Sequence, residues 1–248
     1  MASCQNESIK ETVSETVDSA YPFIDEIENA HMKNEFMERG NVSFDIALTL
    51  GGKERLNGII TLSADSRNGK IENKDSSVIL FNDDKVFVSP EIENMSSARF
   101  AAYTWSYFFM FPYKLSDGGT KWGDYENGML GQLDYDAYKL TFDAGTGDAP
   151  DDWYIMYADK ESHLINTAAN IVTASGTVEE AEEDPHAIEY CDYSIVDGIP
   201  VAQTWRFWTW RADQGLTDQL GNAAISKVKF HETAADFYAP LTSYKEAK

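Results

Sequence analysis

The stretch Val42-Ser-Phe-Asp-Ile-Ala-Leu-Thr-Leu50 decides the fold class, because apolar and polar side chains alternate along it. The apolar set is Val42, Phe44, Ile46, Leu48 and Leu50. A period of two places one set of side chains on each face of a β-strand. We therefore predict a strand with one face buried in a core and the other close to solvent.

Further strands follow this one without intervening helices. Gly51-Gly52 and Asn68-Gly69 are typical of turns, and Asn82-Asp83-Asp84 is a third turn. Strands are expected over residues 59–64, Lys70–Lys74, Val78–Asn82 and Lys85–Ser89. Consecutive strands favour an antiparallel meander.

Two segments break the period of two and predict helices. The first predicted helix covers Tyr21 to Arg39. Pro22 and several acidic residues lie in its first turns, and Gly40 follows its last residue and terminates it. Its predicted apolar face comprises Phe23, Ile27, Ala30 and Met37, with Ile24 adjoining. Ser96 to Phe111, capped by Ser96 or Ser97 and ended by Pro112, is apolar nearly all round its last two turns. Such a helix must be buried or must cover something apolar.

Strands resume in the second half, and one of them is rich in aromatics. Expected strands are Tyr138–Asp143, Trp153–Tyr157, His163–Ser175, Ile188–Val196, Val201–Arg211 and Ile225–His231, with a loop-rich segment at 116–131 and an acidic loop at Glu179–Asp184. Within Val201–Arg211, Trp205 and Phe207 share one face and Trp208 and Trp210 the other. Bulky aromatics on both faces indicate an ordinary core under a covering element, a lipid pocket, or a sugar-stacking surface.

The charge of the chain restricts its partners. Its 42 acidic and 20 basic residues give a formal net charge of −22, which repels nucleic acid and anionic lipid headgroups. We therefore expect no nucleic-acid partner. The longest apolar run, Phe100 to Tyr113, is shorter than the roughly 20 residues that span a bilayer.

No standard catalytic constellation is present, so we expect a protein that is not an enzyme and uses no cofactor. The sequence has no Gly-x-Ser-x-Gly elbow, phosphate-binding loop or Rossmann fingerprint, and its four histidines are isolated from one another. Asp148, Asp151 and Asp152 lie in a Gly/Pro-rich turn. Asx turns explain these carboxylates, and a calcium site is the alternative.

The N-terminus suggests export. Met1-Ala2-Ser3-Cys4 is similar to the end of a bacterial lipobox, in which the cysteine becomes lipidated. The alternatives are a chance cysteine in a tail and a Cys4–Cys191 disulfide. We divide the chain into a flexible tether at 1–19, one β domain at 20–240 and a C-terminal tail at 241–248.

Several motifs together resemble a family of uncharacterised bacterial lipoproteins related to outer-membrane lipoprotein carriers. They are Ala30-His31, Val42–Ile46, Lys85-Val-Phe-Val-Ser-Pro90, Ala98-Arg99-Phe100 with the aromatic run to Phe111-Pro112, and Gly145–Asp152 with Trp153-Tyr154. The likeness spans roughly residues 20–240. It implies a mainly β (α+β) fold, a large curved antiparallel sheet or half-barrel with helices on its concave face, in which carriers hold acyl chains.

The leading hypothesis is a monomeric lipoprotein of the bacterial cell envelope, periplasmic or anchored to the outer membrane through Cys4 alone. It binds an apolar small molecule or an acyl chain. The expected ligand-binding residues are Phe44, Ile46, Leu48, Ile60, Leu62, Trp105, Phe108, Phe109, Trp205 and Phe207. The alternative is a glycan- or partner-binding surface protein that uses exposed Trp208 and Trp210.

Overall fold

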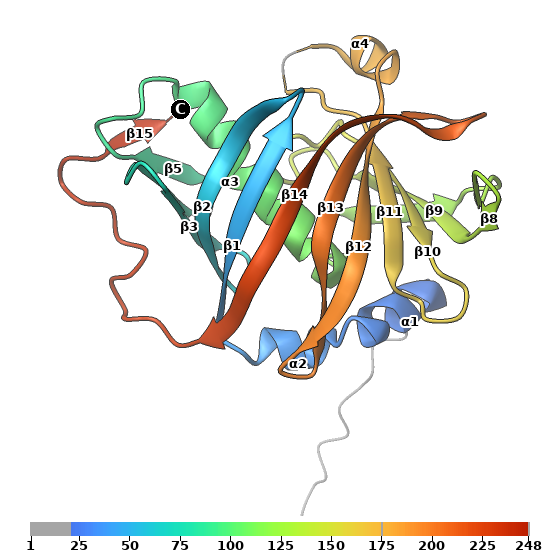
Figure 1. Cartoon of the computed structure of the whole chain (residues 1–248), viewed down its shortest axis with the longest axis horizontal. Helices are drawn as coiled ribbons and strands as arrows, with labels where there is room; N and C mark the ends of the chain where they lie inside the picture. Colours follow the sequence, from blue (N-terminus) through green and yellow to red (C-terminus); the bar gives the residue numbers. More distant parts are fainter. Residues whose placement is uncertain (1–20, 175, 248) are drawn as a thin grey trace, which may run out of the picture.

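The computed structural model describes residues 21–174 and 176–247, which form one curved antiparallel sheet around a long helix (Figure 1). The sheet has 13 strands in the order β15-β5-β4-β3-β2-β1-β14-β13-β12-β11-β10-β9-β6 and does not close into a barrel. Strands account for 47% of the structure and helices for 17%, which confirms the mainly β fold class. The proposed tether at 1–19, with Cys4, lies outside the described residues.

The first half of the chain forms a five-stranded meander. Its strands are β1 Asn41–Leu50, β2 Lys53–Ser63, β3 Asn68–Asn73, β4 Val78–Asn82 and β5 Lys85–Val88. Val42, Phe44, Ile46 and Leu48 are buried, as the alternation predicts, while Leu50 at the end of the strand is only half-buried.

The turn between β2 and β3 lies earlier than expected. It occupies residues 64–67, where Ser66 adopts a left-handed conformation at φ 58°, and the hydroxyl of Ser63 accepts a hydrogen bond from the Asn68 N–H at 3.0 Å. Asn68 and Gly69, predicted as the turn, are instead the first two residues of β3. Phe81 explains the position of Gly69, because a Cβ there would lie 2.1 Å from its ring.

The second half of the chain adds the remaining main strands. They are β9 Asp136–Phe142, β10 Tyr154–Ala158, β11 Ile165–Asn170, β12 His186–Val196, β13 Ile199–Arg211 and β14 Gly215–His231. Strand β14 is long enough to pair with β13 and with β1, so it joins the two halves into one sheet. Register shifts next to Phe44 in β1 and Trp208 in β13 mark bulges, which bend strands and increase their twist.

Three small strand elements lie within or just after the segment at 116–131 that we expected to be rich in loops. β6 Thr120–Asp124 forms one edge of the sheet beside β9, and β7 Met129–Leu130 and β8 Leu133–Asp134 form a separate hairpin. At the other edge, β15 Lys245–Ala247 pairs with β5. The segment expected as a C-terminal tail at 241–248 therefore contains an edge strand, held by backbone pairing and by the burial of Ala247.

The predicted N-terminal helix is two helices, α1 Pro22–Ala30 and α2 Lys33–Met37. The break is at Met32, which has a left-handed backbone with φ 57°. It rotates the second helix, so that Phe36 is buried and Met37, predicted on the apolar face, is 42% exposed. Both helices lie across one end of the half-barrel (Figure 1).

Helix α3 Met95–Met110 runs along the concave side of the sheet, and the 3-10 turn η1 Phe111–Tyr113 follows it (Figure 1). The cap is Asn94 rather than Ser96 or Ser97, because its side chain accepts the Ser97 N–H at 3.0 Å.

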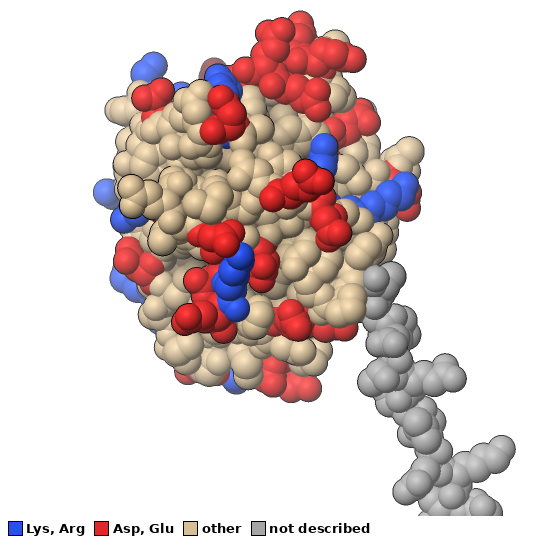
Figure 2. Space-filling view, turned by 90° about the vertical axis from the view of Figure 1, so that its right-hand side faces the viewer, with Lys and Arg blue, Asp and Glu red and all other residues tan. Residues whose placement is uncertain are grey.

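The predicted acidic loop holds a short exposed helix, α4 Val178–Glu182, with a capping box between Thr177 and Glu180. Figure 2 shows acidic side chains gathered over this part of the surface. Among the described residues, no helix is both long and apolar enough to cross a membrane.

Candidate functional site

The ten side chains predicted to bind a ligand come together on the concave face. Every one is at most 7% exposed and belongs to a single apolar cluster. Five come from β1 and β2, three from α3 and two from β13: Phe44, Ile46, Leu48, Ile60, Leu62, Trp105, Phe108, Phe109, Trp205 and Phe207. The period-two pattern of the strands and the all-round apolar pattern of the helix therefore predicted side chains that lie together in one apolar cluster.

Helix α3 packs on the sheet mainly through aromatic rings. Phe109 stacks on Phe44 with ring centroids 4.1 Å apart and planes at 13°. Trp105 meets Phe207 edge-on at 5.9 Å, and Phe108 lies 6.3 Å from the same ring. Contacts of this kind contribute about 0.5–1.5 kcal/mol each beyond the area that they bury.

Polar contacts fix the N-terminal half of α3 between the two ends of the sheet. Arg99 forms two hydrogen bonds with the carboxylate of Asp148, at 2.6 and 3.1 Å, and donates a third to the carbonyl of Asp84. The phenol of Tyr103 donates to the carbonyl of Asp83 at 3.1 Å. The helix thus bridges the β4–β5 turn and the β9–β10 loop.

The side chains of α3 fill the concave face. A cavity of about 20 Å³ remains where η1 and α3 meet β12 and β13, and its lining includes His31, Phe108, Phe109, Tyr113, Tyr190 and Trp205. That volume accommodates one water-sized group, whereas small-molecule sites occupy roughly 300 Å³ or more. An acyl chain can occupy this face only if α3 moves away from the sheet.

His31, one of four histidines that stand apart from one another in the sequence, is fully buried and lines this cavity. Its Nε2 accepts the backbone N–H of Ile165 at 3.1 Å, and its ring lies edge-on to Tyr113 and Tyr193. Burial lowers the pKa of His31 from 6.5 to about 3, so the ring is neutral at physiological pH. Its Nδ1 is buried without a hydrogen-bond partner.

Solved structures share this arrangement of sheet and helix. A LolA superfamily protein from Nitrosomonas europaea superposes with a TM-score of 0.54 at 10% identity, over 84% of this chain and 97% of its own. A domain from Vibrio parahaemolyticus, described as an outer membrane lipoprotein-sorting protein, gives 0.52 at 10% identity, over 86% and 95%. A DUF1329 family protein from Desulfovibrio piger gives 0.52 at 13% identity, over 90% and 98%.

The chain has a LolA-like fold. The resemblance inferred from the motifs is thereby confirmed at the level of the fold. No protein-family model matches the chain, and no curated protein sequence does either.

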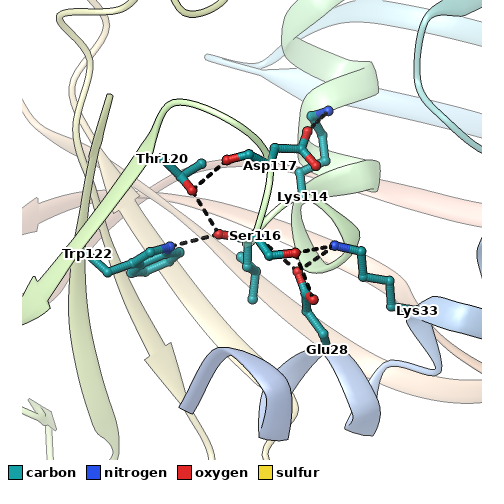
Figure 3. A network of polar contacts seen from close by, with 8 residues as sticks. Glu28, Lys33, Lys114, Ser116, Asp117, Thr120 and Trp122 are labelled. Carbon is teal, nitrogen blue, oxygen red and sulfur yellow. Dashed lines mark hydrogen bonds and ion pairs between the residues drawn. The ribbon is translucent and has the colours of Figure 1, made fainter. Parts of the chain in front are cut away.

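A polar network ties the N-terminal helices of the LolA-like half-barrel to the segment after α3 (Figure 3). Glu28 on α1 is 8% exposed, and its carboxylate accepts the Nζ of Lys33 at 2.7 Å and the backbone N–H of Ser116 at 2.9 Å. The carbonyl of Leu115 accepts the indole N–H of Trp122 at 2.8 Å. Because these partners lie on α1, α2 and β6, the network holds one end of the half-barrel together.

The second face of β13 is covered by the chain itself. Trp210 is 4% exposed and packs with Leu130 of the β7–β8 hairpin in a separate cluster on the convex side. Trp208 is half-buried, and its indole N–H donates to Glu189 at 3.0 Å. Trp210 is therefore not the exposed stacking residue that the glycan-binding alternative requires, because the hairpin covers it.

Two of the three aspartates of the calcium alternative, Asp148 and Asp152, are engaged by other partners. Asp148 pairs with Arg99, while Asp152 accepts the N–H and the hydroxyl of Thr173 at 2.8 and 2.7 Å. Desolvation raises the pKa of Asp152. Within residues 21–174 and 176–247, no three His, Cys, Asp or Glu residues gather in a way that could hold a metal ion.

Cys191 is a free thiol on β12. Partial burial, with a smaller contribution from the nearby Glu189 carboxylate, raises its pKa to about 11. A thiol with such a pKa stays protonated at physiological pH and is a poor nucleophile.

Proposed function

We propose that this protein is a non-catalytic lipoprotein of the bacterial cell envelope that binds an acyl chain or similar apolar molecule between α3 and the sheet. The main observation behind this proposal is that α3 is apolar toward the sheet and lies along the concave side of a LolA-like half-barrel. One neighbour of this fold is described as a lipoprotein-sorting protein, which agrees with an apolar cargo.

Binding requires α3 to act as a lid. An acyl chain would replace the contacts that Trp105, Phe108 and Phe109 make with β1 and β13. Each buried methylene group contributes about 0.8 kcal/mol, so ten of them supply about 8 kcal/mol toward displacing the helix. In the bound state the acyl chain would cover the apolar sheet residues that α3 covers in the free state. These residues would therefore stay shielded from water in both states.

The proposed anchor is a lipid on Cys4, which would tether the domain to a membrane without a spanning segment. Mass spectrometry of the chain exported with a signal sequence in a bacterial host tests this part separately. An acyl modification is expected on the wild-type chain and on the matched Cys191→Ser control, and none on Cys4→Ser. An unmodified wild-type chain would leave the acyl-binding proposal intact but remove the anchor.

Quenching of tryptophan fluorescence by a brominated acyl ester tests where the chain binds, because bromine quenches only on close approach. Trp105 and Trp205 belong to the concave cluster, whereas Trp153 and Trp208 pack on the convex one. We expect saturable quenching that is largely lost in Trp105→Phe/Trp205→Phe and retained in Trp153→Phe/Trp208→Phe. Quenching that persists in the first variant and disappears in the second would place the ligand on the convex side and refute the proposal.

A further inference from the structure

The two halves of α3 are held on the sheet by different kinds of contact. The C-terminal half buries four large apolar side chains, those of Trp105, Phe108, Phe109 and Met110. The buried residues of the N-terminal half are two alanines, Ala98 and Ala102. Because stabilisation grows with the apolar area that is buried, an alanine contributes far less than an aromatic ring. The N-terminal half therefore depends more on its polar contacts.

These polar contacts come chiefly from Arg99. Its guanidinium donates to both carboxylate oxygens of Asp148 in the β9–β10 loop and to the carbonyl of Asp84 in the β4–β5 turn. The ring of Tyr103, one turn along the helix, lies 5.1 Å from the guanidinium carbon. In the order of the sheet, β4 and β5 lie near one edge, and β9 and β10 lie near the other. Arg99 therefore links the two sides of the open half-barrel.

This link is accessible to water. The side chains of Arg99 and Asp148 are 23% and 45% exposed. Solvent and dissolved salt weaken an ion pair at such a position. The link can therefore break and re-form more readily than the aromatic contacts in the core beneath α3.

The segment that follows α3 is held by buried groups. Tyr113 stacks on Phe36 of α2 with ring centroids 3.8 Å apart, and both rings are buried. Leu115 is fully buried, and the N–H of Ser116 donates to the largely buried carboxylate of Glu28 at 2.9 Å. The C-terminal end of α3 is therefore the fixed end of the helix.

We propose that the contacts of Arg99 with Asp148 and Asp84 form a latch, and that α3 opens from its N-terminal end by turning about residues 111–116. This inference rests on the proposed function, in which α3 is the lid, and it states how that lid opens. Such a motion is a hinge, in which a few residues at the end of an element absorb the change. The ligand would enter between the β4–β5 turn and the β9–β10 loop, and the latch would re-form behind it.

Reaction of a buried thiol with iodoacetamide tests the latch, because the thiol reacts when the helix lifts. The reporter is Ser106→Cys on α3, in the full chain carrying Cys4→Ser and Cys191→Ser. Ser106 is 5% exposed and its hydroxyl has no hydrogen-bond partner, so the replacement breaks no bond. We expect Asp148→Asn to quicken labelling about 5- to 30-fold. Added salt should quicken labelling of the latched chain more than that of Asp148→Asn.

Two controls distinguish the latch from a general loosening of the fold. Asp143 pairs with Lys121 on β6 rather than with α3, so Asp143→Asn should leave labelling at Ser106→Cys unchanged. Ala169 is fully buried in the convex cluster, and Ala169→Cys should react equally slowly with and without Asp148→Asn. Equal acceleration at both thiols, or none at Ser106→Cys, would overturn the latch.

Hydrogen exchange at the Ser116 amide tests the position of the hinge. Because this amide donates to Glu28 beyond the fixed end of α3, its exchange should be the same in Asp148→Asn and in the wild type. Exchange at Ser116 that quickens as much as thiol labelling would show that α3 leaves at both ends, and the hinge would be wrong.

Binding of methyl decanoate separates this inference from the proposed function. We expect the ester to associate faster with Asp148→Asn than with the wild type, because the lid is open more often. If thiol labelling quickens but neither chain binds the ester, the latch stands and the proposed function falls. If both chains bind the ester at the same rate, the proposed function stands and the latch does not control entry.

Discussion

The buried imidazole of His31 makes the stability of the protein depend on pH. Its pKa is about 3 in the folded chain and an ordinary 6.5 when unfolding exposes it. The unfolded state therefore takes up a proton that the folded state excludes. The contribution of the neutral His31 ring to the free energy of unfolding is fully present above pH 6.5. It is lost progressively as the pH falls from there toward 3.

This linkage gives a measurable difference between variants. Between pH 7 and pH 5, His31 lowers the free energy of unfolding by about 2 kcal/mol. Urea unfolding should show His31→Gln losing about 2 kcal/mol less than the wild type over that interval, since glutamine can still accept the Ile165 N–H but does not titrate. Equal losses in wild type and His31→Gln would contradict the buried neutral ring.

A second prediction at this scale concerns Phe109, which is 6% exposed and stacks on Phe44. Phe109→Ala should lower the free energy of unfolding by about 3–5 kcal/mol, because it removes a buried ring and leaves a cavity. Phe100 on the same helix is 38% exposed, and Phe100→Ala should cost less than about 1 kcal/mol. Similar costs for the two variants would show that α3 is not seated on the sheet as described.

Residue patterns predicted the apolar cluster but not His31. The ten predicted side chains are apolar at strand or helix spacing, and burial follows from that alone. His31 belongs to no metal or catalytic motif. Its environment depends on a hydrogen bond from the backbone N–H of Ile165, which is 134 residues away in the sequence. The fate of Asp148 likewise depends on Arg99, a partner 49 residues distant.

At the scale of elements, the closed end of the half-barrel depends on Glu28. Its carboxylate holds Lys33 and the backbone of Ser116, so it joins α1, α2 and the segment that leads from α3 to β6 (Figure 3). A hydrogen bond in which the donor or the acceptor is charged is stronger than one between two neutral groups.

Loss of this carboxylate should loosen one end of the molecule first. Glu28→Ala leaves the Ser116 N–H without its acceptor and should lower the free energy of unfolding by about 1–3 kcal/mol. Hydrogen exchange at the Ser116 amide should quicken more than exchange in β1. Glu26→Ala, an exposed site on the same helix, serves as the control and should change neither quantity appreciably. Unchanged exchange at Ser116 in Glu28→Ala would rule out this role.

Helices and strands with a periodic hydrophobic pattern were predicted well. Elements whose position depends on backbone conformation or on strand pairing were predicted poorly. β1 agrees with the alternation and α3 with the all-round apolar helix, whereas the turn between β2 and β3 lies earlier than predicted. The break at Met32 was missed because a left-handed residue leaves no trace in hydrophobic spacing. β15 was missed because three residues are too few for a pattern, and its place comes from pairing with β5.

For the whole molecule, sequence motifs indicated the half-barrel, but whether its interior is full or empty depends on side-chain packing. The sheet is continuous only because β14 pairs with β1 across the two halves of the chain. Hydrophobic periodicity does not specify that pairing. Nor does it give the space left between α3 and the sheet, where the cavity is about 20 Å³.

Native mass spectrometry of the delipidated full chain with methyl decanoate tests the central claim most directly, because it counts ligands on each chain. We predict a monomer that takes up one ester per chain in a saturable manner, with accelerated hydrogen exchange in α3 as the helix leaves the sheet. A chain that takes up no ester, or takes it up without saturation and with α3 fully protected, would contradict an acyl site beneath α3.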